Sequence, residues 1–178
     1  MTMWVFGYGS LVWNPGFDVA EQRLARLAGF ARSFCMRSIH HRGTEAAPGL
    51  VLALDAARDH VCEGVGLRVP EGQEDRVLAY LRERELVSSA YLEQIHVILL
   101  DDGRMVDAVV YVIDPHHVQY CGGLDLEEQA QIIARASGGM GPNHEYLTNT
   151  AEHLTALGIQ DDELAWLARR VRDLRGEG

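Results

Sequence analysis

The carboxylate of Glu85 is the first candidate for chemistry in this sequence. A helix is predicted over 71–86, with Leu78 and Leu81 on its apolar stripe. A rotation of about 100° per residue places Glu85 within that stripe and Glu83 on the solvent side. A buried carboxyl group has a raised pKa, which suits a general base. The alternative is a helix that ends near Glu85 with its side chain in water, and spacing alone does not choose between the two.

The segment Phe6 to Leu11, in which two glycines bracket Tyr8, is the second candidate. Glycine permits a tight turn and the close approach of a ligand. The backbone N–H groups of Tyr8, Gly9, Ser10 and Leu11 could then form a nest for an anion. An ordinary glycine turn is the alternative, because the segment matches neither the GxGxxG loop nor the GxSxG nucleophile elbow. A Ser10 hydrolase would need a histidine and an acid nearby, which spacing neither shows nor excludes.

Two further segments carry groups that could contact a substrate. Arg42, in His40-His41-Arg42, could bind an anionic group, although the sequence alone favours an ordinary polar loop for this segment. Adjacent histidines alternate faces on a strand, so they do not readily bind one metal ion. Asn143 is predicted to cap a helix N-terminus. Tyr146 would then lie in the first turn, where carboxylates and phosphates bind.

Composition limits the chemistry further. The net charge of −10, without a basic patch, argues against nucleic-acid binding. All 16 basic residues are arginine, so a P-loop lysine and a lysine Schiff base are excluded. The eight histidines and three cysteines show no spacing typical of a metal site. We therefore expect a reaction without metal.

The hydrophobic pattern bears on location. No apolar run reaches the ~18 residues of a membrane span, and no signal peptide is apparent. We therefore expect a cytoplasmic protein that does not bind membranes. The sequence does not indicate an oligomeric state.

Strands are predicted early in the chain and helices late. This order predicts an α+β fold, with a mixed sheet or small β-barrel and flanking helices. A polar turn is expected between the third and fourth strands, and a tight hairpin turn at 101–104. The predicted strands are Met3–Tyr8, Phe30–Ser38, Leu50–Leu54, Cys62–Val69, Tyr91–Leu100 and Met105–Ile113, and the predicted helices are Glu71–Leu86, Leu126–Ala136, His144–Leu157 and Asp161–Leu174.

Taken together, these segments resemble the ChaC family of glutathione-specific γ-glutamylcyclotransferases. The resemblance spans roughly Trp4 to Leu174, and the order and spacing of the segments carry it. Leu50 and Leu67 depart from residues that some members have, arginine and an aromatic residue respectively. The matching segments are Trp4–Pro15, His41–Gly43, Pro48–Gly49, Gly64–Pro70, Arg84–Glu85 and Asn143–Leu147.

The resemblance implies one γ-glutamylcyclotransferase-like domain over residues 1–178 and a lyase reaction that needs no cofactor. The α-amine of glutathione attacks its own γ-carbonyl, which releases 5-oxoproline and Cys-Gly. Glu85 would be the general acid/base, and Tyr8–Leu11, Arg42 and Tyr146 would bind the substrate. Two alternatives remain: a cyclotransferase for another γ-glutamyl amine, and a non-catalytic module that binds γ-glutamyl groups.

Overall fold

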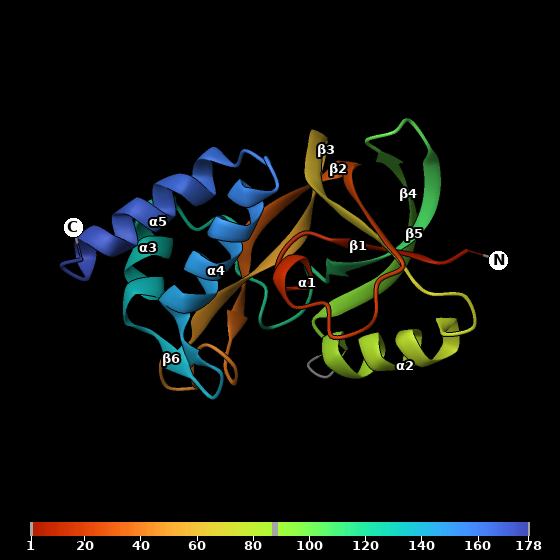
Figure 1. The fold of residues 1–178 in the computed structure, drawn as a ribbon. Helices are drawn as coiled ribbons and strands as arrows, with labels where there is room; N and C mark the ends of the chain where they lie inside the picture. Colours follow the sequence, from red (N-terminus) through yellow and green to blue (C-terminus); the bar gives the residue numbers. More distant parts are fainter. Residues whose placement is uncertain (1, 87–88, 178) are drawn as a thin grey trace. The chain divides into compact units, whose positions relative to one another are not determined.

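The fold is built on a five-stranded barrel with flanking helices (Figure 1), and the computed structural model describes residues 2–86 and 89–177. The strand order is β1-β3-β2-β4-β5, closed into a ring. The barrel is mixed, because β1 pairs antiparallel with β3 and parallel with β5. The predicted α+β fold with a small mixed barrel is therefore confirmed. The strands are β1 (Trp4–Gly7), β2 (Glu21–Ser38), β3 (Gly49–Arg68), β4 (Tyr91–Leu100) and β5 (Met105–Ile113).

Contacts within the chain divide it into two compact units. The first comprises Met1–Ser33 and Ala53–Val118, and the second comprises Phe34–Leu52 and Gln119–Gly178. The two long strands, β2 and β3, contribute residues to both units. The expectation of one domain over the whole chain stays a prediction.

The first unit contains the barrel core and two helices, α1 (Ser10–Trp13) and α2 (Glu74–Glu85). Acidic residues begin α2, where the helix dipole favours negative charge. The hairpin of β4 and β5 has the predicted bounds, and its turn contains Gly103 with φ of 91°. That positive φ is a conformation that glycine adopts without steric cost. Fully buried apolar side chains of this unit include Phe6, Leu67, Leu81, Ile98 and Tyr111.

The second unit is mainly helical. Figure 1 shows α3 (Leu126–Arg135), α4 (Asn143–Ala156) and α5 (Asp162–Leu174) packed side by side. The side chains of Asp125 and Asp161 cap the N-termini of α3 and α5 by accepting backbone N–H bonds. A two-stranded ribbon, β6 (Ser137–Gly138) and β7 (Gly141–Pro142), precedes α4. In the part of the chain that is described, no helix has the length and apolar character to cross a membrane.

Two predicted strand boundaries are wrong. A polar turn was expected between Leu54 and Cys62, but β3 continues through it. Asp59 has φ of 68° there, so the backbone deviates locally while the strand continues. Similarly, β2 begins well before Phe30 and contains Gly29 with φ of 88°. In both strands a residue with a positive φ lies within the strand. The sequence pattern at such a residue predicts instead that the strand begins or ends there.

Candidate active site

Glu85 is the last residue of α2 and belongs to the buried side of that helix. Its side chain is 15% exposed, whereas Glu83 is exposed. Val77 and Leu81, which precede it on the same stripe, are fully buried. The predicted helix phase, with Glu85 inward and Glu83 outward, is confirmed.

The surroundings of Glu85 favour its protonated form. Burial raises the pKa of the Glu85 carboxyl above its ordinary value, and the positive charge of Arg84 opposes that rise. The position of Glu85 at the C-terminus of α2 also raises its pKa, because the negative end of the helix dipole disfavours a carboxylate there. Glu85 is therefore a stronger base than an ordinary glutamate, which is the property required for accepting a proton near neutral pH.

Arg84 joins the end of α2 to the segment around α1. Its Nη2 donates to Ser10 Oγ at 3.0 Å, and its Nη1 donates to the backbone oxygens of Asn14 at 2.6 Å and Pro15 at 3.1 Å. Its Nε lies 3.4 Å from Glu85 Oε1. One guanidinium group thus contacts both ends of α1 and the candidate base.

The predicted substrate-binding segment Tyr8–Leu11 follows β1 directly. Its first residue, Tyr8, is fixed by hydrogen bonds at its side chain and at its backbone. The Tyr8 hydroxyl donates to the backbone oxygen of Tyr111 at 3.2 Å. Arg32 Nη1 donates to the backbone oxygen of Tyr8 at 3.0 Å. A Cβ on Gly7 would lie 3.1 Å from a Val65 methyl group, so this glycine permits close packing of β1 against β3. The first unit therefore brings Ser10 of this segment and Glu85 to a common partner, Arg84.

A network on the neighbouring strands was missed by reasoning from the sequence. Tyr111 of β5 donates to Glu93 Oε1 of β4 at 2.9 Å, and Arg82 Nη2 donates to Glu93 Oε2 at 2.9 Å. Burial raises the pKa of the Tyr111 hydroxyl far above its ordinary value, and the bond to Glu93 and the negative charge of Glu85 add to the rise. Hydrogen bonds from Arg82 hold the pKa of Glu93 below its usual range.

A signal for this network was present in the sequence. Glu93 is a carboxylate in an apolar strand, and the predicted hairpin register places it opposite Tyr111. Cross-strand partners of this kind interact directly. The hairpin was therefore sufficient to predict the pair, although not its link to Arg82.

Arg42 and Tyr146, the other predicted substrate contacts, lie in the second unit and have structural partners there. The Arg42 side chain is 8% exposed, lies 5.9 Å from the centre of the Tyr146 ring and donates to the backbone oxygen of Pro142 at 3.1 Å. The Tyr146 hydroxyl accepts a bond from the backbone N–H of Leu52 at 3.1 Å. Their contact with a substrate stays a prediction.

The predicted helix-capping role of Asn143 is wrong. Pro142 occupies the N-cap position of α4, and Asn143 is the first residue of that helix. The Asn143 amide instead accepts from the N–H of Leu50 and donates to its carbonyl oxygen, both at 2.8 Å. The side chain therefore acts as a strand partner for the start of β3, a long-range role that local patterns do not reveal.

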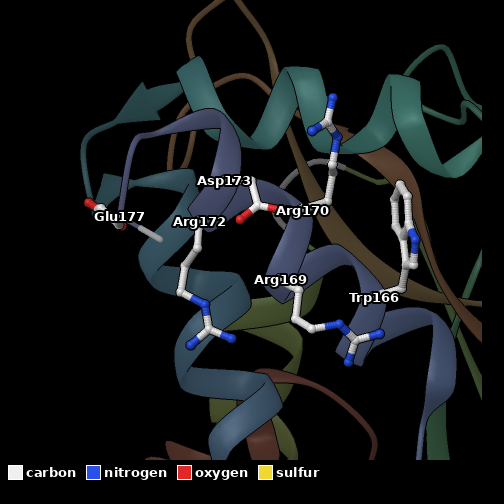
Figure 2. Close-up of a pocket in the computed structure, with 6 residues that line it drawn as sticks. All are labelled: Trp166, Arg169, Arg170, Arg172, Asp173 and Glu177. Carbon is white, nitrogen blue, oxygen red and sulfur yellow. The ribbon is translucent and has the colours of Figure 1, made fainter.

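The pocket in Figure 2 lies along α5 in the second unit and has a cavity volume of about 550 Å³. Arg170, on its wall, already pairs with Glu127 of α3 at 2.7 Å. No residue of the predicted site lines this pocket, whose charged walls are typical of a solvated helix surface. The lining residues are Trp166, Arg169, Arg170, Arg172, Asp173 and Glu177.

The contacts of Ser10 bear on the hydrolase alternative. The partner of Ser10 Oγ is the guanidinium of Arg84, which cannot accept a proton at working pH. A serine nucleophile needs a base at that position, so the contact argues against a Ser10 hydrolase. Among the described residues, no group of three or more histidine, cysteine, aspartate or glutamate side chains could hold a metal ion.

Comparison with known proteins shows both a family match and a shared fold. The family described as ChaC-like protein matches residues 3–174. A glutathione-specific gamma-glutamylcyclotransferase from Escherichia coli is 39% identical over 98% of this chain and 75% of its own length. Gamma-glutamylcyclotransferase 2-3 of Arabidopsis thaliana is 36% identical, over 99% of this chain and 92% of its own.

A solved structure is also similar over nearly the whole chain. The crystal structure of a gamma-glutamyl cyclotransferase specific to glutathione from yeast has a TM-score of 0.89 and 25% identity, and covers 99% of this chain and 98% of its own. The family match extends over almost all of the sequence, and relatives above 30% identity cover it equally fully. The chain therefore belongs to the ChaC-like family of γ-glutamylcyclotransferases.

Proposed function

We propose that this protein is a glutathione-specific γ-glutamylcyclotransferase in which Glu85 is the general acid/base. The observation that carries the proposal is the half-buried Glu85 carboxylate, with its raised pKa, beside the arginine that also binds Ser10. The names of the relatives supply the substrate, glutathione. A cytoplasmic location and a reaction without a cofactor belong to the same proposal.

The reaction begins with the γ-glutamyl α-ammonium group. Glu85 removes a proton from it, and the amine nitrogen attacks the γ-carbonyl carbon of the same molecule. The five-membered ring closes, and Glu85 returns the proton to the departing nitrogen as the carbon–nitrogen bond to Cys-Gly breaks. The ring nitrogen loses a second proton, which the released amine takes up, so that the nitrogen of 5-oxoproline keeps one hydrogen. The products are 5-oxoproline and Cys-Gly. Since nucleophile and electrophile share one molecule, the protein mainly holds the substrate in an attack conformation.

The segment Tyr8–Leu11 supplies the groups that bind the substrate in this proposal. Its backbone N–H groups stabilise the negative charge that develops on the γ-carbonyl oxygen. The fixed position of Tyr8, bonded at its hydroxyl and its backbone oxygen, supports this assignment, because preorganised donors stabilise a transition state best. Roles for Arg42 and Tyr146 in binding the substrate remain part of the proposal.

Two glutamates on α2 provide the matched test. Glu85→Gln keeps the shape of the side chain but removes the base, so we expect turnover of glutathione to fall by about 10²- to 10⁴-fold. Glu83→Gln changes an exposed residue of the same helix, and we expect near-normal turnover. Release of 5-oxoproline measures both. An inactive Glu83→Gln protein beside an active Glu85→Gln protein would contradict the assignment.

The same assay tests the substrate. Wild-type protein is incubated in parallel with glutathione and γ-glutamyl-alanine, and we expect 5-oxoproline only from glutathione. Turnover of γ-glutamyl-alanine would favour the cyclotransferase for another γ-glutamyl amine. Binding of both compounds without turnover would favour the non-catalytic module.

A further inference from the structure

We propose that Arg84 is a positioning residue that fixes the Glu85 carboxylate relative to the segment Tyr8–Leu11. The inference rests on the proposed function, because it assigns a role in that reaction. Arg84 binds three points along α1 and its C-terminal end, and it also contacts Glu85. The two parts of the proposed machinery are therefore joined through one side chain.

The short helix α1 depends on such a partner. It has only four residues, Ser10–Trp13, and a helix this short has almost no stability of its own. Arg84 contacts its first residue, Ser10, and binds the backbone oxygens of Asn14 and Pro15 that follow its last turn. Carbonyl groups at the end of a helix lack partners within the helix. The guanidinium of Arg84 supplies donors to the carbonyl groups at the C-terminal end of α1.

The shape of the arginine side chain matters as much as its charge. A guanidinium presents five N–H donors in a rigid plane, whereas a lysine ammonium is a compact charge on a flexible stem. Arg84 uses Nη1 and Nη2 on the α1 side and directs Nε to Glu85. Tyr80, one turn earlier, also lies 3.2 Å from Nη1 through its hydroxyl. Lysine cannot reproduce this set of directions.

The contact between Arg84 and Glu85 is itself informative. Adjacent residues on a helix normally do not face each other, so a separation of 3.4 Å between Nε and Oε1 requires both side chains to turn to one side of the helix end. The two side chains are 19% and 15% exposed, and their interaction is accordingly less screened than on an open surface. The positive charge keeps more of the base ionised at a given pH.

The other titratable groups near Glu85 are hydrogen-bonded to partners of their own. The negative charge of Glu85 contributes to the raised pKa of Tyr111 on β5. The Tyr111 hydroxyl donates to Glu93 of β4, which in turn is paired with Arg82 of α2. On α1, Ser10 carries no charge. Loss of the Arg84 charge would therefore leave the effect of burial unopposed, and the pKa of Glu85 would rise further.

Three variants test the role. Arg84→Lys keeps the charge and loses the fork, so we expect kcat for glutathione to fall about 10- to 100-fold, as for other losses of positioning, with the acid limb of the pH profile unmoved. Arg84→Met also loses the charge, so its acid limb should move to higher pH. Arg76→Met is the matched control on α2, because Arg76 is exposed and binds Gln73 near the start of that helix, and its kinetics should be unchanged.

A second measurement does not depend on turnover. The Glu85 carboxyl is titrated by carbon-13 NMR in wild-type protein and in the Arg84→Met variant, and its pKa should be higher in the variant. If Arg84→Met does not fold, Arg84→Gln replaces it in both measurements. A purely structural role would lower the melting temperature and leave both the acid limb and the Glu85 titration in place, which would overturn the proposal.

The outcomes separate this inference from the proposed function. Active wild type, inactive Glu85→Gln and Arg84 variants with normal kcat would overturn the positioning role alone. Wild type without 5-oxoproline release would overturn the proposed function, and an unshifted Glu85 titration in the variant would then overturn the link between Arg84 and Glu85 as well. A lowered kcat in Arg84→Lys, with a shifted titration in Arg84→Met, supports the role.

Discussion

Asn143 offers a stability prediction that can be worked out from the structure. Its amide pairs with both backbone groups of Leu50, each at 2.8 Å. Asn143 and Leu50 are both fully buried. The backbone packs closely against the amide oxygen, because a Cβ on Gly49 would lie 2.8 Å from Asn143 Oδ1. Water therefore has little access to replace the amide.

The Asn143→Ala variant removes both bonds at once. It leaves one buried N–H group and one buried carbonyl of Leu50 without the partner they have now. Each such group costs about 1–3 kcal/mol, so we expect the free energy of unfolding to fall by about 2–6 kcal/mol. The total stability of a protein is about 5–15 kcal/mol, which makes this loss large enough to deplete the folded protein at 37 °C.

Urea unfolding of the variant measures the loss, with Asn149→Ala as the control. Asn149 lies on the same helix and is half-exposed, so its replacement should change stability by no more than about 0.5 kcal/mol. Asn143→Asp keeps an acceptor for the Leu50 N–H group and loses the donor. It should be least stable at neutral pH and recover in acid, where a protonated carboxyl can donate. An Asn143→Ala variant with the same free energy of unfolding as the wild type would refute this reasoning.

Two further predictions concern the first unit. Bonds from Arg23, then Arg104 and Arg68, lower the pKa of Glu21 from 4.5 to about 2, so the stability it contributes is present above pH 4.5 and is lost as pH falls toward 2. The unfolding free energies of wild type and Glu21→Gln should converge as pH falls over that interval. A difference that stays constant with pH would contradict this prediction. Gly64→Ala should lower the unfolding free energy by about 1–3 kcal/mol, because its Cβ would meet the backbone oxygen of Gly7; an unchanged denaturation midpoint would count against this.

The part of the site that could be predicted from the sequence is the part that depends on local periodicity. The rotation between successive residues of a helix is fixed by its geometry, so the inward direction of Glu85 and the outward direction of Glu83 followed from their spacing. The hairpin of β4 and β5 was predicted with its observed bounds because its turn, which contains a glycine, is also a local signal.

Contacts between distant segments could not be predicted in this way. Arg84 and Ser10 are 74 residues apart, and Asn143 and Leu50 are 93 apart. Helix propensity and spacing contain no information about which loop the end of a helix will meet. The capping role assigned to Asn143 was the best local interpretation, and a tertiary partner overrode it. The continuous course of β3 through Asp59 is likewise not evident from local patterns.

The direction of the pKa shift separates Glu85 from three other glutamates that lie beside arginine. Glu21 and Glu127 accept direct bonds from guanidinium groups at 2.7 Å, and the pKa of each is lowered to about 2. Glu93 accepts bonds from Arg82, and its pKa is lowered too. These carboxylates are stabilised in their charged form and are weak bases.

Glu85 has an arginine neighbour as well, yet its pKa moves in the opposite direction. Arg84 lies 3.4 Å away and directs its shorter bonds to Ser10, Asn14 and Pro15, so it acts on Glu85 mainly through its charge. Burial then exceeds that attraction and keeps the carboxylate basic. A closer bond from Arg84 would lower the pKa of Glu85, as the arginine bonds lower that of Glu21, and the loss of Arg84 would raise it further. In the proposed reaction, this division of the guanidinium between α1 and Glu85 would leave the carboxylate basic enough to accept a proton and return it.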